Sequence, residues 1–247
     1  MITLDAILIA ADTSRSQAYA QALLANEMKI KRVLVCKPTS NVYSSHLKNM
    51  ERPKIDVPLP DLNIPLIDTC EAIANELVVL DTESVNSPEV YDYLHTRDPK
   101  LIIYSGFAGQ IVGSPIISLQ ADILHIHSGW LPRYRGSTTL YYSIIEEGAC
   151  GVSAILLNSE IDKGVLVGRR KFALPTRNTD IDHLYDGAIR ACLLVDVLLD
   201  WHSRDCSFKA IFDEDIEGRD FYVIHPILKH IAILSLEKES DTLRQNI

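Results

Sequence analysis

Two histidines one residue apart, His125 and His127, are the residues of this sequence best suited to chemistry. In a β-strand alternate side chains point to the same face, so both imidazoles would lie side by side while Leu124 and Ile126 face the other way. Imidazoles transfer protons near neutral pH and also bind metals. The pair alone fits three interpretations: hydrogen bonding at a strand end, a zinc site completed by a carboxylate, or acid–base catalysis.

The apolar runs around the histidine pair predict alternating strands and helices, which is typical of an α/β fold with a mainly parallel sheet. The pair ends one of the predicted strands, and in open α/β sheets ligands collect beyond the carboxyl ends of strands. We expect strands at residues 5–11, 31–36, 77–80, 101–104, 123–127, 152–157 and 165–172, and helices at residues 14–28, 70–77, 137–147 and 180–201. A mixed or strand-rich segment follows at residues 208–234.

Glycine-rich nucleotide motifs are missing from the positions where this fold would carry them. Neither the exit of the first strand (AADTSRS) nor the turn SGFAG after the strand at residues 101–104 supplies GxGxxG, and no GxxxxGK[ST] occurs. The sequence therefore gives little support to hydride transfer with a dinucleotide or to a P-loop nucleotide site.

The composition argues against a nucleic-acid polymer as the partner. The formal net charge is −9 with a pI near 5.3, and no long Lys/Arg block occurs. The 5 cysteines are scattered without CxxC spacing, which favours a reducing cytoplasmic location over a disulfide scaffold. The N-terminus lacks the features of a signal peptide, and no run of about 18 apolar residues predicts a membrane span.

Four short motifs follow one another in the middle of the chain. They are His127, the loop LPRYRG at residues 131–136, GVS at residues 151–153 and DKG at residues 162–164. Together they resemble the 10-formyltetrahydrofolate-dependent formyltransferase family, whose pattern is Asn-x-His, Leu-Pro-x-Tyr-Arg-Gly, Gly-Val-[ST] and Asp-x-Gly. The resemblance covers about residues 101–172. It implies a Rossmann-like formyltransferase fold, with a twisted sheet and helices on both faces, over residues 1–203 and a C-terminal extension at residues 204–247.

The resemblance also implies roles for particular residues. His127 would transfer protons, Asp162 would orient its imidazole, and His125 would stabilise the negative charge that develops on the formyl oxygen. The folate pocket would be lined by Gln110, Ile111, Val112, Ser159, Glu160 and Ile161. The amine substrate would meet the loop beyond the histidines, at Trp130, Arg133, Tyr134 and Arg135.

The chain departs from the family pattern at three places. His125 replaces the usual asparagine, Ser128 and Gly129 replace Pro-Ser, and Glu160 replaces a common glycine. An imidazole N–H can donate where an asparagine amide would, so the oxyanion role can survive the first change. We assign no metal ligand, although a metal site made by the two histidines and Asp162, and a catalytically silent fold, both stay open as alternatives.

Members of the family formylate initiator tRNA, a purine-pathway nucleotide or a nucleotide-linked amino sugar. The negative net charge argues against initiator tRNA as the substrate. The segment IAADTSRS at the exit of the first strand has no glycine and so lacks the phosphate-binding turn of the purine-pathway enzyme. We therefore expect transfer of a formyl group from 10-formyltetrahydrofolate to the primary amine of a small molecule, by preference a nucleotide-linked amino sugar, with no nucleic-acid or membrane partner and a possible homodimer. A folate-dependent hydrolase that releases formate and a silent folate or nucleotide binder are the alternatives.

Overall fold

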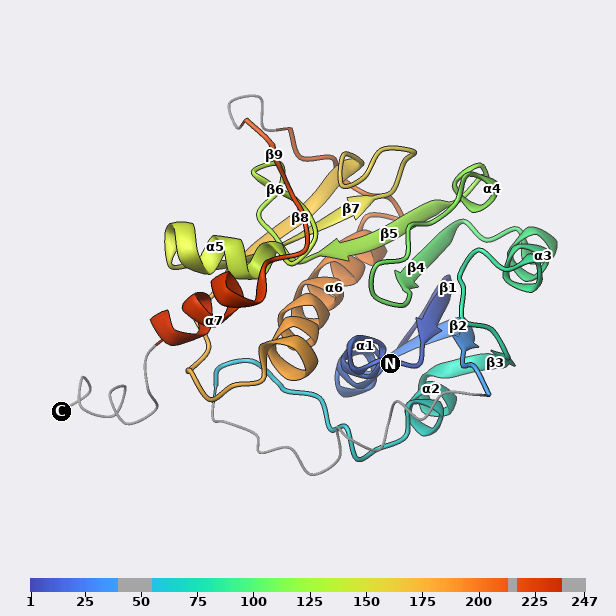
Figure 1. Cartoon of the computed structure of the whole chain (residues 1–247). Coiled ribbons are helices and arrows are strands. Elements are labelled where there is room, and N and C mark those ends of the chain that lie inside the picture. The colour runs from blue at the N-terminus through green and yellow to red at the C-terminus, as the bar shows by residue number, and fades with distance from the viewer. Residues whose placement is uncertain (40–54, 213–216, 237–247) are drawn as a thin grey trace.

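The computed structural model describes residues 1–39, 55–212 and 217–236, and it is built around one 7-stranded sheet in the order β3-β2-β1-β4-β5-β7-β8 (Figure 1). Pairing is parallel from β3 to β5, while β7 runs antiparallel to both β5 and β8. The mainly parallel α/β fold is thus confirmed. The strands are β1 (Ile2–Ala11), β2 (Met28–Cys36), β3 (Ala74–Leu80), β4 (Leu101–Ser105), β5 (Asp122–His127), β7 (Cys150–Leu156) and β8 (Val165–Phe172).

Helices cover both faces of the sheet, as predicted, and bury a different core on each. The larger core includes Leu124 and Ile126 of β5 and packs against α1 (Ser14–Ala25), α2 (Leu66–Ile73), α5 (Thr139–Glu147) and α6 (Asp186–Ser203). The smaller core includes Ile123 and packs against α3 (Pro88–Arg97) and α4 (Ser114–Ile117). Since side chains alternate along a strand, His125 and His127 lie on the face of Ile123.

Two helices end earlier than the sequence predicts. Met28, expected to be helical, is the first residue of β2, because α1 ends at Ala25 and Glu27 adopts a left-handed φ of 53°. The helix expected at residues 70–77 is α2, which ends at Ile73. Ala74 is already extended, and the chain continues directly into the edge strand β3 without a loop.

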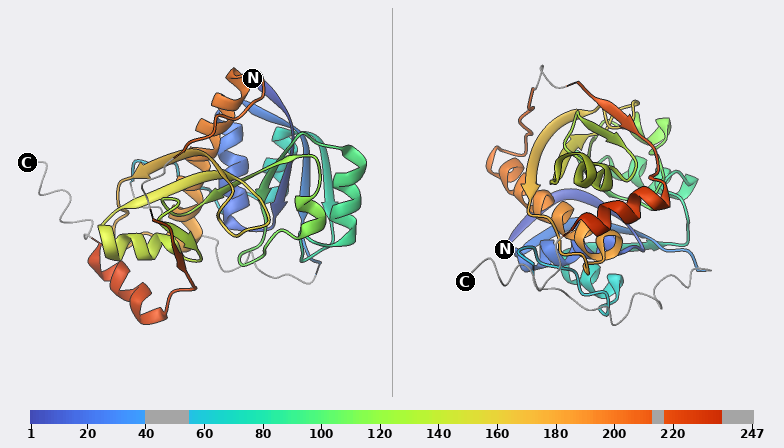
Figure 2. Two further views of the ribbon diagram at one scale, coloured as in Figure 1. Left: turned by 90° about the horizontal axis from the view of Figure 1, so that it is seen from above. Right: turned by 60° about the vertical axis from the view of Figure 1, so that its left-hand side comes forward.

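The C-terminal part of the chain lies at the periphery of the molecule, beside α5 (Figure 2). A short π-helical segment, Ile181–Tyr185, leads into α6, and β9 (Arg219–Phe221) then pairs in parallel with β6 (Tyr134–Gly136). Helix α7 (Pro226–Ser235) packs against α5. Residues 213–216 and 237–247 of the predicted extension lie outside the described residues. None of the described helices combines the length and apolar character that crossing a membrane requires.

Candidate active site

The two histidines sit where predicted, on one face at the end of β5. Their ring centroids are 6.5 Å apart, and the ring of Tyr104 on the neighbouring strand β4 lies 5.7 Å from that of His125. On the other side, His127 is in register with Ser153 of β7. Helices α3 and α4 pack on the same face, over Ile123, whereas His127 is contacted by the loops after β5 and β7.

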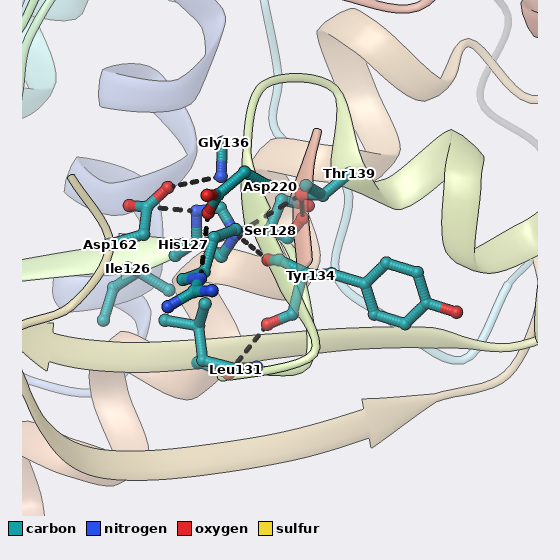
Figure 3. A network of polar contacts seen from close by, with 12 residues as sticks. Ile126, His127, Ser128, Leu131, Tyr134, Gly136, Thr139, Asp162 and Asp220 are labelled. Atoms are coloured by element: carbon teal, nitrogen blue, oxygen red, sulfur yellow. Dashed lines mark hydrogen bonds and ion pairs between the residues drawn. The ribbon is translucent and has the colours of Figure 1, made fainter. Parts of the chain in front are cut away.

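Both ring nitrogens of His127 have a neighbour (Figure 3). Nε2 lies 2.7 Å from the carbonyl oxygen of Tyr134, and Nδ1 lies 3.4 Å from Oδ1 of Asp162. A carbonyl oxygen can only accept, so Nε2 carries the hydrogen of the neutral ring and Nδ1 is left with a lone pair. Nδ1 and the Asp162 carboxylate then face each other as two acceptors, and one proton shared between them would satisfy both.

Asp162 reaches His127 through a loop that reverses direction. Strand β7 begins near His127 and runs away from it, so that Leu156 lies opposite Leu124 at the far end of β5. The segment at residues 157–164 must therefore turn back over the sheet, and Asp162 itself has a left-handed φ of 52°. Its second carboxylate oxygen, Oδ2, accepts a hydrogen bond of 2.7 Å from the backbone N–H of Gly136.

Side chains that sequence reasoning left without a role hold the loop after β5. The hydroxyl of Ser153 donates to the carbonyl of Gly129 at 2.7 Å and accepts from the N–H of Leu131 at 2.9 Å. Thr139 donates from its hydroxyl to the carbonyl of Ser128. Ser153 belongs to the GVS motif and could have been found by that signal, whereas Thr139 carries no motif of its own.

His125 occupies a buried and positively charged environment. Burial, followed by the charges of Arg190, Arg15 and His127, lowers its pKa well below the ordinary value of 6.5. Its Nδ1 is buried and has no hydrogen-bond partner among the described residues. Burial also lowers the pKa of His127, against the opposing effect of Asp162. Both pKa shifts favour the neutral imidazole, and a neutral ring can accept a proton or a metal ion.

Sequence reasoning did not identify the two arginines beside the histidines. Arg190 of α6 donates to the carbonyl of Ile126 at 2.6 Å and pairs with Asp186 at 2.8 Å, so it ties α6 to β5. Arg15, in the first turn of α1, donates to the carbonyl of Gly106. Burial and the charge of Arg190 lower the pKa of Arg15. Only the structure shows that these two distant positions converge on His125.

The predicted folate residues after β4 differ in exposure. The side-chain amide of Gln110 bridges two backbone groups, accepting from Val85 N–H at 3.1 Å and donating to the carbonyl of Glu83. Gln110 thus fixes the shape of its loop. Ile111 is 62% exposed, while Val112 is buried in the smaller core. Of the three, Ile111 is the side chain that a ligand could touch most readily.

Ser159, Glu160 and Ile161, the predicted folate residues after β7, are all exposed. Glu160 pairs with Lys163 at 2.7 Å, and its N–H donates to Asn158. Ile161, next to Asp162, is 56% exposed. The two loops thus each present one large apolar side chain to solvent.

The predicted substrate residues lie on the loop between β5 and α5, and each already has a partner. Trp130 packs under the cationic groups of Arg169 and Lys171, with the guanidinium carbon of Arg169 4.6 Å from its ring centroid. The ring of Tyr134 is buried, and the backbone carbonyl oxygen of the same residue faces His127. The two loop arginines form ion pairs, Arg133 with Glu147 and Arg135 with Asp220.

A family model and several known proteins match this chain. A model of the formyl transferase family matches residues 5–187. Methionyl-tRNA formyltransferase of a Nitratiruptor species is 30% identical over 90 residues, which cover 36% of this chain and 29% of that protein. The chain matches between 29% and 52% of the length of three such relatives.

Solved structures show the same fold. A sugar N-formyltransferase from Shewanella sp. FDAARGOS_354 superimposes with a TM-score of 0.59 at 18% identity, covering 93% of this chain and 87% of that one. An N-formyltransferase from Helicobacter canadensis, in complex with folinic acid and dTDP-3-aminofucose, gives a TM-score of 0.53 at 15% identity, with 87% and 70% of the chains covered. Because the family model matches residues 5–187, which is most of the sequence, the chain belongs to the formyl transferase family.

Proposed function

We propose that this protein transfers a formyl group from 10-formyltetrahydrofolate to the primary amine of a small substrate, and that this amine is carried by a nucleotide-linked amino sugar. The observation that carries the proposal is the contact of His127 Nδ1 with Asp162 Oδ1 at 3.4 Å, in a ring whose other nitrogen is held by the Tyr134 carbonyl. Family membership supports the reaction, and the acidic balance of the chain supports a small acceptor.

The cosubstrate supplies the formyl carbon, and the protein handles the protons. As the amine nitrogen bonds to that carbon it must lose a proton, and Nδ1 of His127 is the nitrogen with a free lone pair to take it. The new positive charge on the ring is stabilised by Asp162, whose carboxylate is fixed by the Gly136 N–H. The same proton can then pass to the folate nitrogen as its bond to the formyl carbon breaks, so that no proton is gained or lost.

His125 is placed to stabilise the negative charge that develops on the formyl oxygen. A neutral imidazole has one N–H donor, as the amide of the asparagine in the family pattern does. Nearby Arg15 and Arg190, whose charges act on His125, add positive potential at the same point. Loss of one such donor typically lowers turnover about 10²–10³-fold.

The loops on either side of the histidines suit a flat, largely apolar ring system. Ile111 follows β4 and Ile161 precedes Asp162, and both expose more than half of their surface. Small-molecule sites are lined mainly by apolar side chains with a few polar groups among them. We infer that the pteridine of the cosubstrate packs against these two side chains, while Gln110 holds the first loop in shape.

The experiment is to incubate the purified protein with 10-formyltetrahydrofolate and a panel of amines, and to follow tetrahydrofolate release and the mass of the product. The panel contains nucleotide-linked amino sugars, simple amino sugars and aminoacylated initiator tRNA. His127→Asn and Asp162→Asn are each expected to lower turnover about 10²–10⁴-fold. His95→Asn is the control, because that ring stacks on Tyr91 of α3 away from the site.

Each outcome bears on a different part of the proposal. Unchanged turnover in both site variants would overturn the catalytic roles, and formylation of tRNA alone would overturn the small acceptor. Formate release that does not depend on any amine would identify the hydrolase instead. The homodimer stays a prediction, which sedimentation of the same protein sample tests.

A further inference from the structure

The three side chains with roles in the proposed transfer reaction, His125, His127 and Asp162, also have the composition of a metal site. Each residue offers a ligand atom, and these atoms all lie within 4.8 Å of one another. Among the described residues this is the one such group of three or more His, Cys, Asp or Glu. It exists because His125 replaces an asparagine of the family pattern, which has a much poorer metal-binding side chain.

Each of the three side chains has a ligand atom that makes no hydrogen bond to any described residue. In His127 and Asp162 the other polar atom is hydrogen-bonded to the backbone. The Nε2–H of His127 donates to the Tyr134 carbonyl, which points the Nδ1 lone pair toward Asp162. A metal-binding histidine usually donates its second N–H to a carbonyl or carboxylate in this way. Oδ2 of Asp162 accepts the Gly136 N–H and leaves Oδ1 facing His127, while Nδ1 of His125 has no partner to lose if its ring turns.

The distances match those around a small divalent ion. With metal–ligand bonds of about 2.0–2.1 Å in a tetrahedral arrangement, neighbouring ligand atoms lie about 3.4 Å apart. Nδ1 of His127 and Oδ1 of Asp162 are 3.4 Å apart, so an ion could bridge them without movement. The ligand nitrogen of His125 lies within 4.8 Å of these two atoms, and rotation of the His125 ring would bring it closer.

We propose that His125, His127 and Asp162 form a binding site for one divalent transition-metal ion, which takes two imidazole nitrogens and one carboxylate oxygen as ligands. Such a set leaves at least one coordination position open to water or to a substrate atom. Arg15 disfavours a second positive charge nearby, whereas Asp186 neutralises Arg190. The ion therefore binds as a reversible ligand and is not locked into the fold.

A metal ion in this site should block formyl transfer, an expectation that rests on the proposed function. An ion bound to Nδ1 of His127 and Oδ1 of Asp162 takes the lone pairs that would otherwise receive the proton of the amine. Metal binding and formyl transfer then exclude each other. Micromolar Zn²⁺ should inhibit the transfer, and a chelator should restore it.

The test titrates the full, metal-free chain with Co²⁺ and Zn²⁺, following the visible d–d bands of cobalt and the heat of zinc binding. We expect one ion per chain, and at least about 100-fold weaker binding in His125→Asn and in Asp162→Asn, since loss of even an outer contact costs 10–100-fold. All proteins carry Cys206→Ser, because Cys206 is an exposed thiol that could bind metal alone. His202→Asn, which removes an exposed histidine of α6, is the matched control.

The outcomes separate this proposal from the proposed function. Failure of the wild-type chain to bind one ion, or equal binding by His125→Asn, overturns the metal site even if formyl transfer is observed. Retained binding in a protein that transfers formyl groups to no acceptor overturns the proposed function and leaves the metal site standing. His125→Asn restores the residue type of the family pattern, and its melting curve is recorded to test that the variant is folded.

Discussion

At the scale of single residues, the environment of His127 decides what its ring can do. Two contacts orient the imidazole, one from the Tyr134 carbonyl and one from Asp162, and both come from backbone-supported loops. The backbone at Gly129 packs closely against this ring. A Cβ on Gly129 would lie 2.7 Å from Nε2 of His127 and 2.7 Å from the Tyr134 carbonyl oxygen. The absence of a side chain at position 129 is therefore part of the site.

Gly129→Ala should displace the ring of His127 or the Tyr134 carbonyl, because the backbone on one side cannot yield easily. Overpacking of this kind costs about 1–3 kcal/mol of stability. A shift of about 1 Å in a catalytic group can lower turnover about 10²-fold. Steady-state kinetics and urea unfolding measure the two effects.

Ser128→Ala is the matched control for Gly129→Ala. The Ser128 hydroxyl is buried without a hydrogen-bond partner among the described residues. Its removal leaves no other group unpaired, so Ser128→Ala should leave the stability unchanged or raise it by up to about 1–3 kcal/mol. If both variants lowered turnover and stability equally, the effect of Gly129→Ala would not come from a clash with the His127 ring.

Sequence alone predicted His127 and Asp162 as partners only through their motif context. The alternation of β5 placed both histidines on one face, and this was right because Leu124 and Ile126 do pack in the opposite core. The approach of Asp162 could not be derived in this way. Strand β7 carries the chain away from His127, and only the reversed loop, with its left-handed Asp162, brings the carboxylate back.

At the scale of elements, strands were predicted better than helix ends. An apolar run such as LIIY is long enough for a buried strand and too short for a helix, and it forms β4. Helix ends were harder, since α1 ends just before Glu27 without a glycine and α2 passes directly into β3. Glu27, with its left-handed φ, follows the end of α1, and the extended Ala74 follows the end of α2. In both cases the chain then pairs in the sheet, as β2 and as β3.

The start of the long C-terminal helical segment should respond to pH. Asp180 accepts the backbone N–H of His183 at 2.8 Å and also contacts its ring at 3.0 Å. The hydrogen bond to Asp180 raises the pKa of His183 above 6.5. A raised pKa means that the folded state holds the proton more tightly, so this contribution to stability is complete below pH 6.5 and is lost as the pH rises through the higher folded value.

His183→Gln and Asp180→Asn should both reduce the fall in melting temperature on going from about pH 6 to about pH 9. Asp180→Asn keeps an oxygen to accept the His183 N–H, so it removes the charge while retaining the cap. Thermal melts at half-unit steps of pH measure the slope. A slope equal to that of the wild-type chain in both variants would contradict the assignment of this pH dependence to the pair.

At the scale of the whole molecule, the segment between β5 and α5 is held by residues from the other end of the chain. The matched part of the family model stops at residue 187, yet β9 pairs with β6 far beyond it. The backbone of β9 accepts from Ser137 N–H at 2.9 Å, and its Phe221 ring stacks on Tyr134 with centroids 5.3 Å apart. The same short strand β6 supplies the Tyr134 carbonyl to His127 and the Gly136 N–H to Asp162.

Phe221→Ala should therefore weaken both the fold and the reaction, although the residue touches neither histidine. Its ring also lies 4.6 Å from that of Tyr142, and two aromatic contacts of about 0.5–1.5 kcal/mol each give an expected loss of about 1–3 kcal/mol. Turnover should fall, because β6 no longer holds the Tyr134 carbonyl and the Gly136 N–H in place. Tyr222→Ala is the matched control, since that side chain is 83% exposed. If Phe221→Ala melted earlier but kept full turnover at a temperature where it is folded, β9 would stabilise the molecule without positioning its site.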